Sequence, residues 1–165
     1  MRIKALVTSV CLFALTAQAS CATPRETIEQ VLALINAQRI AHGCEPLRLE
    51  ERLEQAAERE SRDMVERHFF SHTEPDGTTP GARVRKTGYV YQMIGENIEV
   101  NAEMPELAVA TWMNSPGHRA NILTCAFKET GIAVVSQKDD VTVEGVPGVY
   151  KAFWTQVFAM PFQAH

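Results

Sequence analysis

The chain has 165 residues, a formal net charge of −4 at pH 7, 45% hydrophobic residues and four cysteines. This length and composition suit one globular domain with a sizeable core. The acidic balance and the lack of a basic stripe argue against a nucleic-acid-binding protein.

The N-terminal segment has the layout of a secretory signal peptide. Arg2 and Lys4 precede an apolar run that is too short for a membrane span, and the small residues of an A-x-A cleavage site follow it. We therefore predict that residues 1–19 are removed after Ala19 and that the product is secreted or periplasmic. No later segment is apolar enough to be predicted as a transmembrane span.

The signal-peptide prediction divides the chain into residues 1–19, an N-terminal tail over 20–26 and a single domain over 27–162. A second interpretation is a lipoprotein. In that case Cys21, which follows a half-matching cleavage box, becomes the acylated first residue.

Three cysteines remain after cleavage at Ala19, and export would bring them into an oxidising compartment where disulfides persist. Cys21 falls in the predicted tail, whereas Cys44 and Cys125 fall inside the patterned region. We predict a Cys44–Cys125 disulfide, worth about 4 kcal/mol in the chain-entropy model. The alternative is three free thiols.

Amphipathic or capped segments in the first two thirds of the chain predict helices. Apolar residues recur at helical spacing in the first two of these segments, and proline opens the last two. A turn is expected at Asp76-Gly77, before the third helix. The predicted helices cover residues 24–41, about 49–67, 80–87 and 105–113.

Later segments are rich in β-branched and aromatic residues and predict strands at residues 130–136, 141–143 and 148–160. In the last of these, both alternating faces are apolar, so the strand is covered on both sides. We therefore predict an α+β fold, a three-layer α-β-α sandwich with a small, mostly antiparallel sheet.

Four short segments place polar residues next to apolar residues, glycine or proline. They are "HFFSHTEPDG" with His72, "MIGENIEV" with Glu96, "NSPGHRANIL" with His118, and "FWTQVF" with Gln156. A carboxylate in an apolar frame, such as that of Glu96, must be hydrogen-bonded or paired. Taken singly, each residue also fits a structural role.

The placement of His118 has a physical explanation. Ser115 reads as an N-cap and Pro116 as the first helical residue, so His118 falls in the first turn of a helix. The positive end of the helix dipole disfavours an imidazolium there. The placement therefore favours a neutral imidazole, the form that binds a metal or accepts a proton.

Familiar catalytic signatures are missing. The chain has no H-E-x-x-H, no G-x-S-x-G, no P-loop and no dinucleotide fingerprint, and Cys44 and Cys125 follow no C-x-x-C pattern.

The ordered set "FFSH", "GENI", "WMNSPGHRANIL", "TGIAVV" and "FWTQVF" resembles the bacterial branch of the CAP superfamily, whose domain is also called SCP. The name covers cysteine-rich secretory, antigen 5 and pathogenesis-related 1 proteins. The resemblance spans about residues 27–160. It implies an exported α-β-α sandwich.

The resemblance also implies a cleft with two histidines and a glutamate, matched here by His72, His118 and Glu96. In eukaryotic members the cleft has a second glutamate and in several members it holds a divalent cation such as zinc. Ser115 occupies that second position, so the possible metal ligands reduce to His72 and His118. Asn97 and Gln156 are expected to orient the imidazoles.

Three functions remain open. The first is a monomeric secreted module that binds a divalent cation, a polar or lipid ligand, or a cell-envelope component. The second is a hydrolase, a protease or cell-wall hydrolase, in which Glu96 or His118 acts as general base with or without zinc. The third is an extracellular scaffold for a protein partner. No catalytic residue is assigned.

Overall fold

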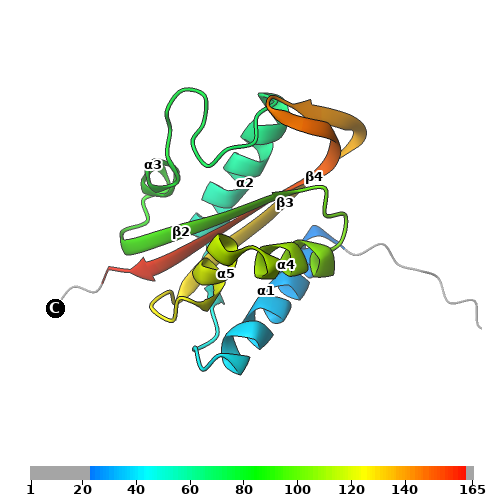
Figure 1. Ribbon diagram of the computed structural model, residues 1–165. Coiled ribbons are helices and arrows are strands. Elements are labelled where there is room, and N and C mark those ends of the chain that lie inside the picture. Colours follow the sequence, from blue (N-terminus) through cyan, green and yellow to red (C-terminus); the bar gives the residue numbers. More distant parts are fainter. Residues whose placement is uncertain (1–22, 163–165) are drawn as a thin grey trace, which may run out of the picture.

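A computed structural model of the chain describes residues 23–162 (Figure 1), and the side chains of residues 138 and 140 are not described. The predicted signal peptide and Cys21 lie outside the described residues. Within those residues, no helix is both long and apolar enough to cross a bilayer.

The centre of the fold is a four-stranded sheet with the order β1-β3-β4-β2. β2 and β3 each pair antiparallel with β4, and β1 runs parallel to β3. This confirms the small, mostly antiparallel sheet. The strands are β1 (Arg48–Leu49), β2 (Tyr91–Val100), β3 (Glu129–Val143) and β4 (Val146–Pro161).

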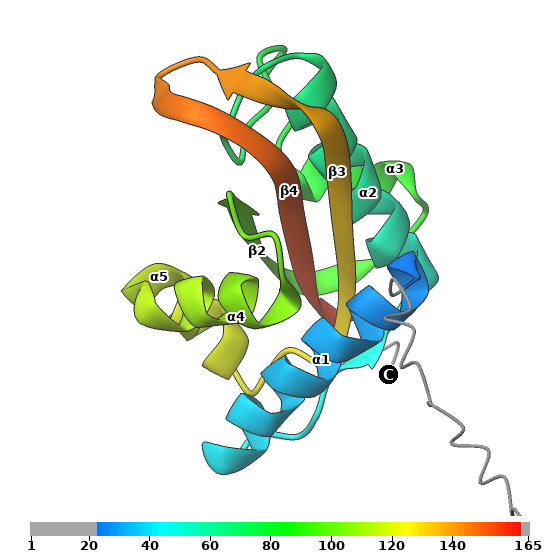
Figure 2. The same cartoon turned by 90° about the vertical axis from the view of Figure 1, so that its right-hand side faces the viewer.

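Five helices cover the two faces of this sheet. α1, α4 and α5 pack on one face, and α2 and α3 pack on the other (Figures 1 and 2). The predicted three-layer α-β-α sandwich is therefore confirmed. The helices are α1 (Pro24–Ala41), α2 (Glu51–Glu66), α3 (Pro80–Lys86), α4 (Pro105–Asn114) and α5 (Pro116–Leu123).

Local sequence signals explain where the helices begin. Thr23 and Glu26 form a capping box at the start of α1, and this helix covers residues 24–41, as predicted. The predicted helix and the predicted tail overlap at residues 24–26, and the structure makes these residues helical. The side chain of Thr79 caps α3 by accepting from Ala82 N, and proline occupies the first position of that helix, as predicted.

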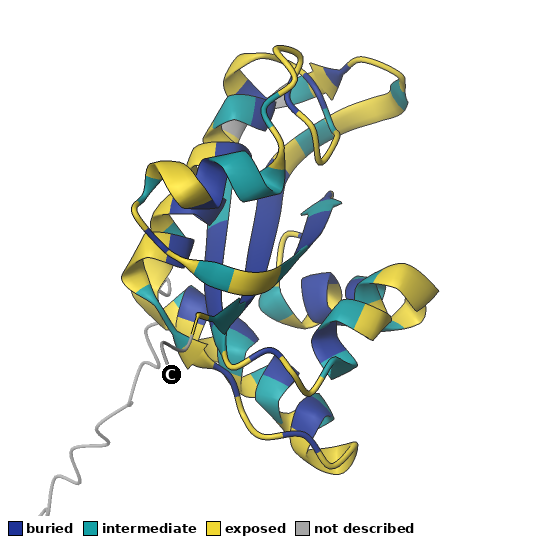
Figure 3. Cartoon of the chain, turned by 90° about the vertical axis from the view of Figure 1, so that its left-hand side faces the viewer, coloured by how far each residue is buried: buried dark blue, intermediate teal, exposed yellow. Residues whose placement is uncertain are grey.

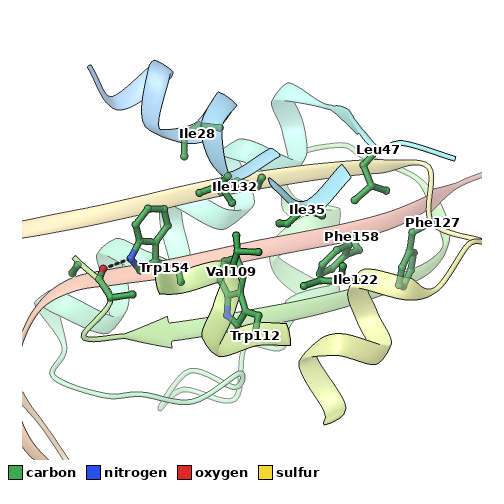
Figure 4. Close-up of a cluster of buried hydrophobic side chains, with 14 residues drawn as sticks. Ile28, Ile35, Leu47, Val109, Trp112, Ile122, Phe127, Ile132, Trp154 and Phe158 are labelled. Carbon is green, nitrogen blue, oxygen red and sulfur yellow. Dashed lines mark hydrogen bonds between the residues drawn. The ribbon is translucent and has the colours of Figure 1, made fainter. Parts of the chain in front are cut away.

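The two faces of β4 belong to separate parts of the core. Trp154 and Phe158 pack with residues of α1, α4 and α5 (Figure 4), whereas Phe153 and Val157 pack with α2. Figure 3 shows the buried residues running along the central strands. The prediction that this strand is covered on both sides is confirmed. Simple alternation predicts that Tyr150 lies on the same face of the strand as Trp154. This is wrong, because the β3–β4 register shifts near Tyr150 and its side chain packs with the cluster that contains Phe153.

Two other sequence expectations need correction. Helical spacing places Leu107 on the inner side of its helix, but it is 48% exposed, since Ala108, Val109 and Trp112 form the buried face of α4. β2 was not predicted as a strand, because the glycine and the charged residues of "MIGENIEV" obscure its alternation.

The predicted disulfide is present. Cys44, which follows α1, is bonded to Cys125, which follows α5. The bond joins positions 81 residues apart and so ties the start of the domain to the helix that carries His118.

Candidate functional site

The candidate site straddles β2, which is an edge strand of the sheet. Successive side chains of a strand point to opposite faces. Glu96 is in register with Val157 and faces the α2–α3 layer, whereas Asn97 is in register with Gln156 and faces the other layer. Groups from both layers can therefore meet around this edge.

His72 lies in the loop after α2 and contacts Glu96. Its Nδ1 is 2.9 Å from Glu96 Oε1, and the side chains are 48% and 2% exposed, respectively. Because an ionised carboxylate only accepts hydrogen bonds, His72 Nδ1 carries the proton and Nε2 is left for other partners. The buried carboxylate thus fixes the orientation of an exposed imidazole.

Arg83 of α3 holds this pair in place. Its Nη2 donates to both carboxylate oxygens of Glu96, at 3.0 and 2.8 Å, and to the backbone oxygen of His72 at 3.0 Å. The Arg83 side chain is 1% exposed. A buried guanidinium that bonds both the carboxylate and the loop of the histidine determines how the two meet.

Two more buried carboxylates surround the same guanidinium. Glu60 Oε2 and Glu74 Oε1 lie 2.9 and 3.5 Å from Arg83 Nη1, and Glu74 Oε2 also accepts from Arg67 at 2.9 Å. With Glu96, three buried carboxylates face two guanidiniums, and the exposed carboxylate of Asp76 lies 3.8 Å from Arg67. A proton on one of the buried carboxylates reduces this excess of negative charge.

Glu60 is the carboxylate that holds that proton. Burial raises its pKa from 4.5 to about 8, against the opposing effect of Arg83, and the charges of Glu96 and Glu74 raise it further. Although Oε2 lies 2.9 Å from Arg83 Nη1, the two groups are not aligned for a hydrogen bond, and no other described residue donates one to either oxygen. Glu60 is therefore largely neutral at pH 7.

His118 approaches from the other layer. It is the third residue of α5, as predicted, and burial lowers its pKa, with a smaller effect from the charge of His72. His118 Nδ1 is buried, and no hydrogen-bond partner for it lies among the described residues. The imidazole is neutral at neutral pH.

An amide network ties the first turn of α5 to β2. Asn97 Nδ2 donates to the backbone oxygen of His118 at 3.2 Å, and Asn121 Nδ2 donates to Asn97 Oδ1 at 2.9 Å and to Glu96 O at 3.0 Å. Asn97 thus acts on the backbone of His118, not on its ring.

The two other candidate residues contribute less. Ser115 sits half-buried at the α4–α5 junction, where its side chain makes no capping hydrogen bond. Gln156 is fully buried in the sheet and donates to Thr130 Oγ1 at 3.2 Å. No hydrogen bond joins Gln156 to His72 or His118, so it is not brought together with the imidazoles.

A pocket of about 270 Å³ opens beside the His72–Glu96 pair. Its lining comes from the His72 loop, the start of α3 and the middle of β2. His118 is not part of this lining. The lining residues are His72, Pro80, Gly81, Ile94, Gly95 and Glu96.

These residues do not fit a tightly held zinc ion. Within residues 23–162, no group of three or more His, Cys, Asp or Glu side chains is arranged to hold a metal. Glu96 is occupied by Arg83, and Ser115 stands where the resemblance places a carboxylate. Only the imidazoles of His72 and His118 remain, fewer than a tight site uses.

Arg83, Glu60 and Glu74 were not predicted from the sequence. One signal was available: Glu60 lies at helical spacing from Leu53, Ala57 and Met64, so it falls on the apolar face of α2. No comparable pattern marks Arg83, because its partners come from α2, β2 and a loop.

Comparison with protein families and curated proteins gives consistent matches. The model of the CAP family, described as the cysteine-rich secretory protein family, matches residues 32–158. The uncharacterized protein YkwD of Bacillus subtilis is 37% identical over 107 residues, and the uncharacterized membrane protein YlbC of the same organism is 32% identical over 106. The match to YkwD covers 65% of this chain and 42% of YkwD, and the match to YlbC covers 64% of this chain and 31% of YlbC. The chain therefore spans less than half the length of either relative.

Solved structures show the same fold. An extracellular SCP-domain protein from Bacillus anthracis is 28% identical with a TM-score of 0.67, covering 86% of this chain and 45% of that one. An outer surface protein from Borrelia burgdorferi has a TM-score of 0.73 at 19% identity, covering 86% and 97% of the two chains.

Proposed function

The chain belongs to the cysteine-rich secretory protein (CAP) family, and from this membership we propose that it is a binding module that acts outside the cell or at its envelope. The location is supported by two structural neighbours, one described as extracellular and the other as an outer surface protein. It is also supported by the signal-like N-terminal sequence and by the disulfide, a bond typical of oxidising compartments.

The observation that carries the binding proposal is the chain of contacts from His72 through Glu96 to Arg83. It presents one exposed imidazole, in a fixed orientation, at the mouth of a small pocket. When neutral, His72 offers Nε2 as an acceptor. The pocket therefore suits a polar ligand with a hydroxyl or N–H donor, such as a saccharide or peptide component of the cell envelope.

Binding is favoured over hydrolysis by Glu96 because that side chain is only 2% exposed and its oxygens already accept from Arg83 and His72. A general base must lie within hydrogen-bond reach of the proton that it removes. In the described structure Glu96 positions His72 and neutralises Arg83.

A hydrolase that uses His118 is the second candidate. The lowered pKa of His118 keeps its imidazole neutral, and Nδ1 is buried without a partner among the described residues. A general base at this position would therefore take a proton through the other ring nitrogen, Nε2. This candidate requires a substrate that spans the β2 edge, since His118 lies outside the pocket lining.

A divalent cation is part of the binding proposal only as a weak ligand of His72 and His118. We expect zinc to bind with low affinity, because two imidazoles must be completed by water. Calorimetric titration with zinc, repeated on the His72→Ala/His118→Ala double variant, measures this contribution. Equal binding by both proteins would remove the cleft from any account of metal binding.

The test of the main proposal is titration with soluble peptidoglycan fragments, the muropeptides. His72→Ala is expected to weaken binding at least about tenfold, because a hydrogen bond in the pocket is lost. His42→Ala, at an exposed histidine at the end of α1, is the control and is expected to bind as wild type does.

Two outcomes decide between the candidates. Turnover of the muropeptides that disappears in His118→Ala would replace the binding proposal with the hydrolase. Muropeptide binding that is unchanged in His72→Ala would contradict the assigned pocket.

A further inference from the structure

The edge of the sheet opposite β2 has an open stretch. β1 occupies this edge only beside Glu129 and Thr130, where Arg48 N donates to Lys128 O and Glu50 N donates to Thr130 O. The even-numbered residues of β3 therefore direct their N–H and C=O groups away from β4.

The alternation continues past the end of β1. Ile132, Val134 and Ser136 keep the same register with β4, so their backbone groups also point outward. The chain leaves the sheet after Leu49 and enters α2 at Glu51. Among the described residues, no strand pairs with β3 there, and no hydrogen bond from a side chain or another backbone segment reaches these groups.

A cavity of about 500 Å³ lies along this stretch, larger than the pocket beside His72. Its floor is β3 from Ile132 to Ser136, and its walls are the first turns of α1 and the middle of α2 (Figure 2). Unpaired backbone N–H and C=O groups at the bottom of a groove can form hydrogen bonds with the backbone of an added strand. The wall residues are Pro24, Arg25, Ile28, Glu54, Glu58 and Arg62.

The strand at this edge lacks two of the usual protections against pairing, charged residues and proline. "TGIAVVS", Thr130 to Ser136, contains no charged residue and no proline. The β2 edge differs, because Asn121 and Trp112 donate from their side chains to the outward oxygens of Glu96 and Ile98. One edge of the sheet is capped, whereas the other is left available.

We propose that the open edge of β3 binds an extended polypeptide from another protein, which adds to the sheet as a further strand. Two observations on the groove define this peptide. The floor is apolar or uncharged, and each charged wall residue already has an opposite partner: Arg25 pairs with Glu54 across the groove, and Arg62 pairs with Glu58. The complementary segment is uncharged, with small or β-branched side chains.

Once the predicted signal peptide is removed, the N-terminal tail of this chain is too short to be the occupant. The described chain begins at Thr23, at the rim of the groove, and cleavage at the predicted position leaves only residues 20–22 before it. Pairing along Ile132 to Ser136 needs about five residues at roughly 3.3 Å each. The wall ion pairs are more than half exposed on the arginine side, so they can rearrange at little cost when a strand enters.

Amide hydrogen exchange tests the register first. In the free protein, the amides of Ile132, Val134 and Ser136 are expected to exchange fast, while those of Gly131, Ala133 and Val135 are protected by β4. Protection of all six amides in the free monomer would show that the edge is already covered and would overturn the proposal.

Binding is tested with a phage-displayed library of random heptapeptides, selected on the wild-type protein. A selected peptide is synthesised and titrated, and it is expected to slow exchange at Ile132, Val134 and Ser136. Val134→Pro removes one outward N–H without touching the β4 ladder, and it is expected to weaken binding roughly tenfold. Val134→Thr keeps that N–H and is expected to bind as wild type does.

Further outcomes complete the test. If Val134→Pro fails to fold, Ser136→Pro, at an exposed position, replaces it, with Ser136→Thr as its control. Failure to select any peptide, or a peptide that binds both proline variants as well as wild type, would overturn the proposal. Concentration-dependent protection of the same amides without peptide would assign the edge to a second copy of the chain and would equally overturn it.

Discussion

The two edges of the sheet are built in opposite ways. Along β2, side chains of Trp112 and Asn121 cap the outward carbonyls, and a network of charged groups lies beneath. Along β3, beyond Thr130, the outward N–H and C=O groups lie at the bottom of a groove with an uncharged floor, and no described residue forms a hydrogen bond with them. The two proposed binding surfaces therefore use different groups, side chains at the β2 edge and backbone N–H and C=O groups at the β3 edge.

The difference shows what each kind of surface requires. A buried carboxylate such as Glu96 is tolerated only because Arg83 and its neighbours compensate for the loss of water. That network needs groups from three elements, α2, α3 and β2. An open strand edge needs only the absence of a covering strand.

Removing the cation under the β2 edge is expected to have the largest effect. Arg83→Met leaves Glu60, Glu74 and Glu96 buried without their shared partner. We expect the free energy of unfolding, measured with urea at pH 7, to fall by about 3–5 kcal/mol. Lys86→Met, at an exposed position of the same helix, is the control, and a loss no larger than that of the control would show that the cluster is not a unit.

The proton on Glu60 makes stability depend on pH. Because the pKa of Glu60 is raised from 4.5 to about 8 in the folded state, the folded protein binds more protons between these values, and its stability falls as pH rises through that range. Glu60→Gln mimics the protonated form and is expected to remove about 3 kcal/mol of this fall.

The measurement is urea unfolding of Glu60→Gln and wild type at intervals from pH 5 to 9, with Glu58→Gln on the exposed face of α2 as the control. The stability curves of Glu60→Gln and wild type are expected to meet near pH 5 and to separate toward pH 9, where Glu60→Gln is the more stable. Parallel curves would mean that Glu60 does not carry the proton.

Removing the side chain that donates to an outward carbonyl of β2 would leave this edge partly unpaired, as the β3 edge is. Asn121→Ala deletes the donor to Glu96 O and to Asn97 Oδ1. We expect a loss of about 2 kcal/mol, because two partly buried acceptors lose their partner. Asn114→Ala, at an exposed position at the end of α4, serves as the comparison. If both variants unfold at the same denaturant concentration, the cap contributes nothing.

Charging the β3 edge is expected to change stability least. Ser136 is exposed, so Ser136→Lys should shift the free energy of unfolding by no more than about 0.5 kcal/mol. It should nevertheless abolish binding of a strand-forming peptide, since lysine is the usual protection of an edge. A large stability change in thermal unfolding would show that this edge is part of the folded core.

Much of the fold could be predicted from sequence because its signals are local. The capping of α3 by Thr79 and the two apolar faces of β4 are read from neighbouring residues. β2 was not predicted because Glu96 and Asn97, on opposite faces of the strand, are both buried, so polar residues do not mark a solvent face.

The candidate site was only partly predictable for the same reason. His72, Glu96 and His118 stand in short motifs, and the structure places His72 on Glu96, with His118 on the far side of β2. Arg83 belongs to no motif, and its role depends on contacts between elements far apart in the chain. Whether His72 and His118 act on one ligand stays a prediction.

The helix that bears His118 is held at both ends. Beyond α5, Cys125 is bonded to Cys44, and the buried guanidinium of Arg39 donates to the oxygens of Ile122 and Thr124. At the opposite end, the side chain of Asn97 in β2 donates to the backbone oxygen of His118. The backbone that presents the imidazole is therefore fixed from two sides, so a change of ligand size has to be met by side-chain rotation and not by a shift of the helix.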